Sequence, residues 1–236
     1  NNRWSVSFSK CFTDCCFLEE CCDLPCFSLI FFQTFTSDFV VRQMNEVSTA
    51  TPMNVQINGG FVRNGMAGAV FDNDGCFVTV NDVEASNVMT VSLSATANGG
   101  VAFLQNSNIT SCTLEEVTFT TAQGAQSVQN TVISGMLGLR DVFYVEDTGS
   151  SLTVQGGTIR DNDITANSWA GVTILNGATA QISNSEITGN SGVEFGAAAG
   201  GVGSTLTFSN SIISGNTGVV SCLLLTNTAQ FECRCI

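Results

Sequence analysis

Four short acidic stretches are the parts of this chain whose residue types and spacing could do chemistry. They are Asp72-Asn-Asp74-Gly75, Glu115-Glu116, Glu146-Asp147 and Asp161-Asn-Asp163. Neighbouring carboxyl groups can serve as general acid and base, or can bind Ca²⁺ through their oxygens. Asp72 and Asp74 could supply two calcium ligands, but the other positions of a calcium-binding loop are not filled. We interpret these stretches mainly as solvated turns, and calcium is the one cofactor left open.

Basic residues that could assist these acids are few. Arg160 adjoins Asp161, and Arg63 is the second arginine considered as a base. Neither is spaced to converge with a second acid. The chain has no histidine, and Lys10 is its only lysine. The sequence therefore predicts a protein that is not an enzyme and has no catalytic residues.

The N-terminal residues carry a dense group of cysteines. Six of the 11 cysteines follow the pattern C-x3-CC-x4-CC-x3-C. They are Cys11, Cys15, Cys16, Cys21, Cys22 and Cys26. Apolar burial cannot hold a segment this short, so we predict a disulfide-rich cap formed in an oxidising compartment. A metal–thiolate cluster is the weaker alternative, because the chain has no histidine and no Cys-x2-Cys pairs.

The other five cysteines are spread along the chain. They are Cys76, Cys112, Cys222, Cys233 and Cys235. All are disulfide candidates with open pairing, and the odd total leaves at least one thiol without a partner in the chain. The last three are expected to hold the C-terminal end. The only N-x-S/T sequon, Asn108-Ile-Thr110, is a candidate for N-glycosylation of a secreted chain.

Three copies of one repeat indicate which elements position these residues. Each copy joins two apolar fragments through a polar elbow and ends on an asparagine. The copies are Leu152–Asn162, Ala180–Asn190 and Leu206–Asn216. Two apolar ladders, five residues apart, continue backwards from these copies at steps of 23 to 28 residues. The first ladder is Ile57, Val80, Leu104, Val128, Val154, Ile182 and Phe208, and the second is Val62, Ala85, Ile109, Ile133, Ile159, Ile187 and Ile213. Such a repeat predicts a solenoid whose windings share one core.

Polar residues between the two ladders predict a tight corner in every winding. An uninterrupted strand would place residue i+5 on the opposite face, so two inward positions five apart need a corner between them. The corner residues are types that tolerate a left-handed backbone, namely Gly59, Asp82, Asn106, Asn130, Gly156, Asn184 and Asn210. A third strand is expected at 69–71, 88–93, 114–119, 142–145, 172–175, 193–195 and 222–225.

This pattern resembles the right-handed parallel β-helix of the pectin-lyase-like superfamily, through the three copies above and weaker copies back to about Val55. The resemblance implies an all-β solenoid of about seven to eight coils, and the right-handedness rests on it alone. We assign 1–32 to the cysteine-rich N-terminal cap, 33–230 to the β-helix and 231–236 to a cysteine-containing C-terminal lock. A β-sandwich or barrel is the alternative, but it does not explain registered Asn and Ile ladders.

The resemblance also implies what an active site in this fold would contain. Polygalacturonase-like members carry an Asp trio, a Gly-His-Gly motif and a basic pair. Pectate-lyase-like members hold Ca²⁺ with acidic residues and use an Arg as base, often with a Lys nearby. This chain has no histidine for the first motif, and its one lysine lies in the cap. The likeness therefore concerns the fold and is nearly silent about activity.

The net charge of −13, from 7 basic and 20 acidic residues, limits the partners. It repels nucleic acid, anionic membrane surfaces and acidic polysaccharide, unless Ca²⁺ bridges the charges. The best apolar run, Phe27–Phe32, is too short to span a bilayer. The chain has no initiator Met and no recognisable signal peptide, so we expect a processed or partial chain.

We expect a secreted or cell-surface structural module that acts as a rod, fibre or adhesive component. Its partners would be further copies of itself or other matrix and wall proteins, through stacking and lateral contacts. A divergent polysaccharide lyase or hydrolase is one alternative, and a non-catalytic glycan-binding module is the other. For the latter, Phe103, Phe143, Tyr144 and Trp169 are candidate sugar-stacking aromatics, although packing roles are favoured.

Overall fold

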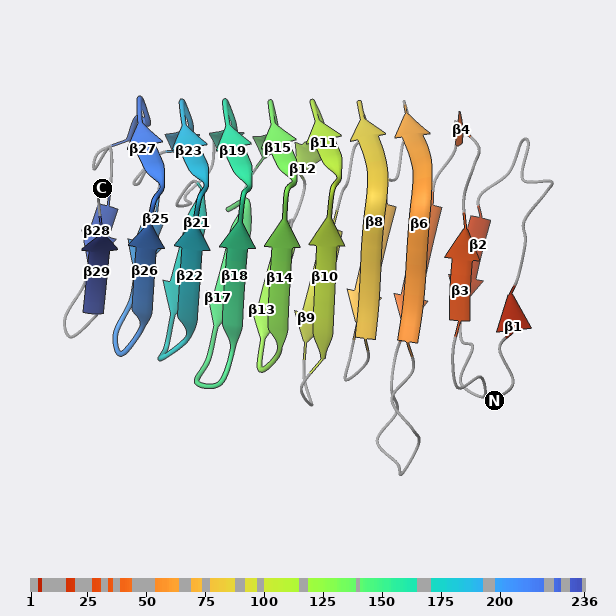
Figure 1. Cartoon of the computed structure of the whole chain (residues 1–236), viewed down its shortest axis with the longest axis horizontal. Coiled ribbons are helices and arrows are strands. Elements are labelled where there is room, and N and C mark those ends of the chain that lie inside the picture. The colour runs from red at the N-terminus through yellow and green to blue at the C-terminus, as the bar shows by residue number, and fades with distance from the viewer. Residues whose placement is uncertain are drawn as a thin grey trace.

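The structure, a computed structural model, is a parallel β-solenoid whose windings follow one another along a single axis (Figure 1). It describes the backbone of residues 4–5, 16–19, 27–30, 34–35, 39–43, 54–63, 69–73, 77–87, 92–96, 100–114, 119–138, 141–164, 171–192, 198–218, 223–225 and 230–234. It describes the side chains of residues 58–59, 77–87, 100–112, 123–138, 141–164, 171–192 and 200–218. Within these ranges the secondary structure is all β, as predicted.

The first and largest sheet has 16 strands and forms two parallel rows. The long-strand row contains β1 (Trp4–Ser5), β3 (Phe27–Ile30), β6 (Asn54–Arg63), β8 (Phe77–Ser86), β10 (Val101–Gln105), β14 (Ala125–Gln129), β18 (Ser151–Gln155), β22 (Thr179–Ser183), β26 (Thr205–Ser209) and β29 (Gln230–Arg234). The short-strand row contains β4 (Thr34–Phe35), β11 (Asn108–Thr110), β15 (Val132–Ser134), β19 (Thr158–Arg160), β23 (Glu186–Thr188) and β27 (Ile212–Ser214). β6 and β8 run through both rows (Figure 1).

Two further sheets complete the walls. The second sheet has nine strands, β2 (Cys16–Glu19), β5 (Phe39–Gln43), β7 (Ala69–Asn73), β9 (Ser92–Thr96), β13 (Phe119–Ala122), β17 (Phe143–Glu146), β21 (Val172–Leu175), β25 (Ala198–Gly200) and β28 (Leu223–Leu225). The third sheet has four, β12 (Thr113–Leu114), β16 (Leu137–Gly138), β20 (Asp163–Ile164) and β24 (Ser191–Gly192). Consecutive windings always pair in parallel, which is the arrangement that a solenoid requires.

The count of coils differs from the prediction of seven to eight. Only about four windings contribute a strand to every sheet, because the third sheet has 4 strands in the described part of the chain. The ladders counted repeats of the first sheet, which continue beyond these windings. The two ladders contain no information about the third sheet, whose strands are only two residues long.

Three third-strand positions were also misplaced. Strands were expected at 88–93, 114–119 and 193–195, whereas the second-sheet strands are β9, β13 and β25, starting four to five residues later. The expected strands at 142–145, 172–175 and 222–225 correspond to β17, β21 and β28. The connection before the second sheet carries no recurring corner residue, so spacing alone could not fix where those strands begin.

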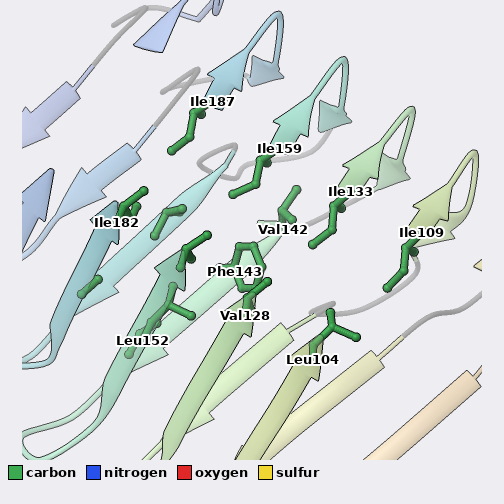
Figure 2. Close-up of a cluster of buried hydrophobic side chains, with 14 of the residues drawn as sticks. Leu104, Ile109, Val128, Ile133, Val142, Phe143, Leu152, Ile159, Ile182 and Ile187 are labelled. Carbon is green, nitrogen blue, oxygen red and sulfur yellow. The ribbon is translucent and has the colours of Figure 1, made fainter. Parts of the chain in front are cut away.

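Among the side chains that the structure describes, both apolar ladders lie in the core, as predicted, and only Ile213 is half-buried. Val128, Val154, Ile182 and Phe208 are registered partners across β14, β18, β22 and β26, and each is at most 2% exposed. Ile109, Ile133, Ile159 and Ile187 form the second column and point inward in a row (Figure 2). Fully burying such a side chain contributes about 1.5–3 kcal/mol. Repetition of this burial in every winding stabilises the solenoid.

The predicted corners are confirmed at all seven positions. Their φ angles are positive: Gly59 73°, Asp82 58°, Asn106 48°, Asn130 47°, Gly156 66°, Asn184 50° and Asn210 48°. A left-handed backbone costs most residues roughly 1–2 kcal/mol, and Gly, Asn and Asp adopt it most readily. The corner re-aims the chain, so that residues five apart both enter the core.

The N-terminal segment continues the same sheets at the level of the backbone. β2 pairs in parallel with β5, and β3 pairs in parallel with β6. The side chains of residues 1–57 lie outside the described residues, so the disulfide cap and the domain boundaries at 32 and 230 stay predictions.

Candidate functional site

The acidic stretch 161–163 lies at the bend after β19. Arg160 Nη1 contacts Asp161 Oδ2 at 3.0 Å, and the two side chains are 51% and 61% exposed. Asp163 is also exposed, whereas Asn162 between the two acids is buried. A water-exposed pair of this kind contributes little to stability and leaves the guanidinium bonded to its own neighbour. Arg160 therefore serves as the partner of an adjacent turn residue.

Glu146 and Asp147 have structural partners in the turn after β17. Tyr144 donates its hydroxyl proton to Glu146 Oε2 at 2.8 Å, and Asn176 Nδ2 donates to Glu146 Oε1 at 2.9 Å. Asp147 has a φ of 76°, and its carbonyl oxygen accepts from the Ser150 N–H at 3.1 Å. Both carboxylate oxygens of Glu146 are thus engaged, and the residue joins two windings.

The calcium candidates cannot be placed as a site. Asp72 lies in β7 opposite Arg42 of β5, but its side chain is outside the described residues, as are Asp74, Glu115 and Glu116. Among the side chains that are described, no group of three His, Cys, Asp or Glu residues could hold a metal ion. The calcium prediction remains untested.

Cys112 is the one cysteine with a described side chain. It is 1% exposed, and its thiol donates to the Thr110 carbonyl oxygen at 3.3 Å. The structure thus places Cys112 inside the core, and its assignment to a disulfide stays a prediction. The other ten disulfide candidates lie outside the described side chains.

Asn108 lies where the sequon requires. It is exposed at the start of β11, Ile109 is 4% exposed, and Thr110 follows on the outer face. The outward placement is confirmed, and glycosylation itself remains a prediction. Of the candidate sugar-stacking aromatics, Phe143 is 0% exposed and packs in the core, so its candidacy was wrong (Figure 2). Phe103 and Tyr144 are half-buried, and Trp169 lies outside the described residues.

A buried column of asparagines is the most organised polar feature. Asn162 Nδ2 donates to Asn190 Oδ1 at 2.8 Å, and Asn190 Nδ2 donates to Asn216 Oδ1 at 2.9 Å. The backbone N–H groups of Asn162 and Asn190 donate to the same oxygens, at 3.2 and 2.9 Å. Each amide also donates to a carbonyl oxygen of the preceding winding, on Ile133, Ile159 and Ile187. The sequence repeat predicted that an asparagine closes each copy, but it did not predict that these asparagines are buried and hydrogen-bonded to one another.

A second polar column was missed from the sequence. Ser107, Thr131, Ser185 and Ser211 each donate a hydroxyl proton to the carbonyl oxygen two residues earlier, at 2.7 to 2.9 Å. Their oxygens accept backbone N–H groups of the preceding winding, from Val83, Ser107, Gly157 and Ser185. The recurring Ser or Thr three residues after the first ladder was the available signal.

Comparisons with known proteins found no likeness from which a family could be assigned. No protein-family profile matches the chain, and searches of curated proteins and of solved structures returned no match. In the described residues, no helix is long and apolar enough to cross a membrane. The class that the structure defines is a parallel β-solenoid with two internal polar columns.

Proposed function

We propose that this chain is a non-enzymatic structural module, a rigid rod segment that works outside the cell or at its surface. The observation that supports it best is the unbroken register of the first sheet, in which β6, β8, β10, β14, β18, β22, β26 and β29 pair one after another. The left-handed corner and the apolar inward positions recur from winding to winding, so rigidity is a property of the whole shaft. A right-handed, pectin-lyase-like winding is part of the proposal.

The described acidic residues favour this function over catalysis. Glu146 bonds Tyr144 of its own strand and joins the next winding through Asn176, and Asp161 pairs with Arg160 at the surface. Both side chains therefore have structural partners. Stacking and lateral contacts with further copies or with other wall components would then provide the activity of the module.

Electron microscopy of the native material tests this proposal. Regular rods or a periodic polymer are the expected result, and dispersed monomers would contradict it. Assays on uronic-acid polymers with the wild type and with Arg160→Gln, Asp161→Asn and Asp163→Asn form the second part. If the wild type cleaves such a polymer and one of these substitutions abolishes the cleavage, the protein is an enzyme and the structural proposal is wrong.

A further inference from the structure

In the described part of the chain, the short-strand row ends at β27. This strand pairs with β23 on one side, and no described strand follows it on the other side (Figure 1). The long-strand row continues one winding further, because β29 pairs with β26. One strand added beside β27 would therefore bring the two rows level.

The apolar core is covered less well at β27 than in the windings before it. Ile213 is half-buried, whereas the four preceding members of its ladder are at most 4% exposed. Ile212, which faces outward on the same strand, is 55% exposed. An apolar side chain on an added strand would cover Ile213 in the way that Ile213 covers its registered partner Ile187.

Backbone donors face the same side of β27. At the second bend, Gly135, Asp161 and Gly189 each donate the backbone N–H to a carbonyl oxygen of the next winding, at 3.0 to 3.2 Å. Gly215 is the next residue in this series, and no described residue accepts from its N–H. The edge thus offers the main-chain group to which every earlier winding adds its successor.

Asn216 ends the buried asparagine column and keeps two donors. Asn162 and Asn190 each donate a backbone N–H and an amide hydrogen to the oxygen of the next asparagine. Asn216 is 5% exposed, and its amide donates to the Ile187 carbonyl oxygen at 2.9 Å. Among the described residues, nothing accepts from its backbone N–H or its second amide hydrogen. Buried donors without acceptors destabilise a fold, so these two groups favour a further partner.

We propose that the outer edge of β27 is a docking site for one extended strand of a partner chain, added in parallel. The partner strand carries an apolar residue that covers Ile213 and, three positions later, an asparagine whose Oδ1 accepts from Asn216. The same spacing separates Ile187 from Asn190 in this chain. Strand addition draws affinity from main-chain hydrogen bonds and selectivity from the side chains between them.

Charge and shape define the kind of partner. Residues 209–218 include no charged residue, although the chain has a net charge of −13. A charged side chain entering this edge would lose hydration, so the partner segment is uncharged at its inward positions. Because β29 already extends the neighbouring row, the place beside β27 has the height of one strand. A single extended peptide fits this step better than the end of a complete second solenoid, so the inference goes beyond the proposed rod.

A synthetic peptide with the sequence of residues 209–218, SNSIISGNTG, is the probe. In β27 itself the Ile212 N–H donates to the Ser185 carbonyl oxygen at 2.9 Å, and the next N–H along a parallel strand faces the opposite neighbour. N-methylation of the peptide at the Ile212 position should weaken binding about tenfold or more, because it removes a hydrogen bond to the protein. N-methylation at the Ile213 position is the matched control and should change binding less than about twofold. Fluorescence anisotropy of the labelled peptides measures both.

Hydrogen exchange of the intact chain, followed by nuclear magnetic resonance, locates the bound peptide. With the peptide at about ten times its dissociation constant, exchange of the Gly215 N–H should slow about tenfold, because only about one site in eleven stays free. The Gly189 N–H already donates to the Ser214 carbonyl oxygen and should not change. In the peptide, Asn216→Leu should weaken binding about tenfold, since it removes the acceptor for the end of the asparagine column.

Three results would overturn the inference. They are no binding of the peptide, equal weakening by the two N-methyl groups, or protection of amides elsewhere while Gly215 is unchanged. Microscopy separates this outcome from that of the proposed function. Rods that do not bind the peptide keep the rod and remove the strand site, whereas dispersed monomers that bind it at β27 remove the rod and keep the strand site.

Discussion

The second bend of the solenoid, after the short-strand row, is filled differently in two regions of the molecule. In the earlier windings the inward residue is Cys112 or Met136, 1% and 0% exposed. In the later windings it is Asn162, Asn190 or Asn216, 1%, 0% and 5% exposed. The backbone follows the same register through both regions. One bend geometry therefore accepts either apolar packing or a hydrogen-bonded amide.

The apolar and the asparagine-filled bends are adjacent at Met136 and Asn162. The backbone N–H of Met136 donates to Asn162 Oδ1 at 3.0 Å, so the first asparagine of the column also bonds the backbone of the last apolar bend. Burying an amide costs free energy unless its hydrogen bonds are made, and within the asparagine column they are made by the windings on either side. A buried amide is thus tolerated here because the asparagines of the neighbouring windings supply its hydrogen bonds. An apolar residue needs no such partners.

The largest effect is expected in the ladder that the two regions share. Ile133→Asp and Ile159→Asp should each lower the free energy of unfolding by about 4 kcal/mol or more, because a carboxylate enters a dry column without a partner. The two costs should be equal, since both residues lie in the same apolar column. Urea unfolding measures them. Thr158→Asp, one residue away and facing outward, is the control, and similar loss in it would mean that the register is wrong by one.

The next effect should separate the regions. Asn190→Met removes the acceptor of Asn162 and the donor to the Ile159 carbonyl, which are both buried. We expect a loss of about 3 kcal/mol from the unpaired groups, measured by the same unfolding experiment.

The reciprocal change is its matched control. Met136→Asn adds an amide beside Asn162, whose Oδ1 can accept from it, and should cost roughly 1 kcal/mol or less. Equal losses in the two variants would show that the asparagine column contributes no cooperative bonding.

A smaller effect is expected at the first corner, which is common to both regions. Asn130 has a φ of 47°, so Asn130→Ala should cost about 1–2 kcal/mol, whereas Asn130→Gly should be nearly neutral. Thermal unfolding of the pair measures the difference. If alanine and glycine behave alike, the left-handed corner is absent in solution.

The smallest effect is expected at the surface. Arg160→Gln breaks the exposed contact with Asp161 and should change stability by about 0.5 kcal/mol or less, with a smaller change in high salt because salt screens an exposed ion pair. A loss several times larger would show that Arg160 has a role beyond its neighbour, and would reopen the search for a site in the asparagine region.

Much of the fold was predictable because the repeat reports it directly. Inward residues and corners recur at fixed spacing, and every described ladder residue except Ile213 is buried, with Ile213 half-buried. The third sheet and the starts of β9, β13 and β25 were not predictable, since their connections vary in length and lack a recurring residue.

The site was less predictable than the fold. Spacing placed Asn108 outward correctly, but it could not show that Glu146 bonds Tyr144 and Asn176, which lie in different windings. The polar columns consist of hydrogen bonds between residues 24 to 28 apart in sequence. These bonds could be identified only once the structure showed how the windings stack.

Methyl–methyl nuclear Overhauser contacts in the first ladder test the central claim most directly. Parallel stacking predicts strong contacts from Val154 to both Val128 and Ile182, and from Ile182 to the ring of Phe208, with none between Val128 and Phe208. Absence of the Val128–Val154 and Val154–Ile182 contacts, or contacts from Val154 to residues of an antiparallel neighbour, would contradict the solenoid.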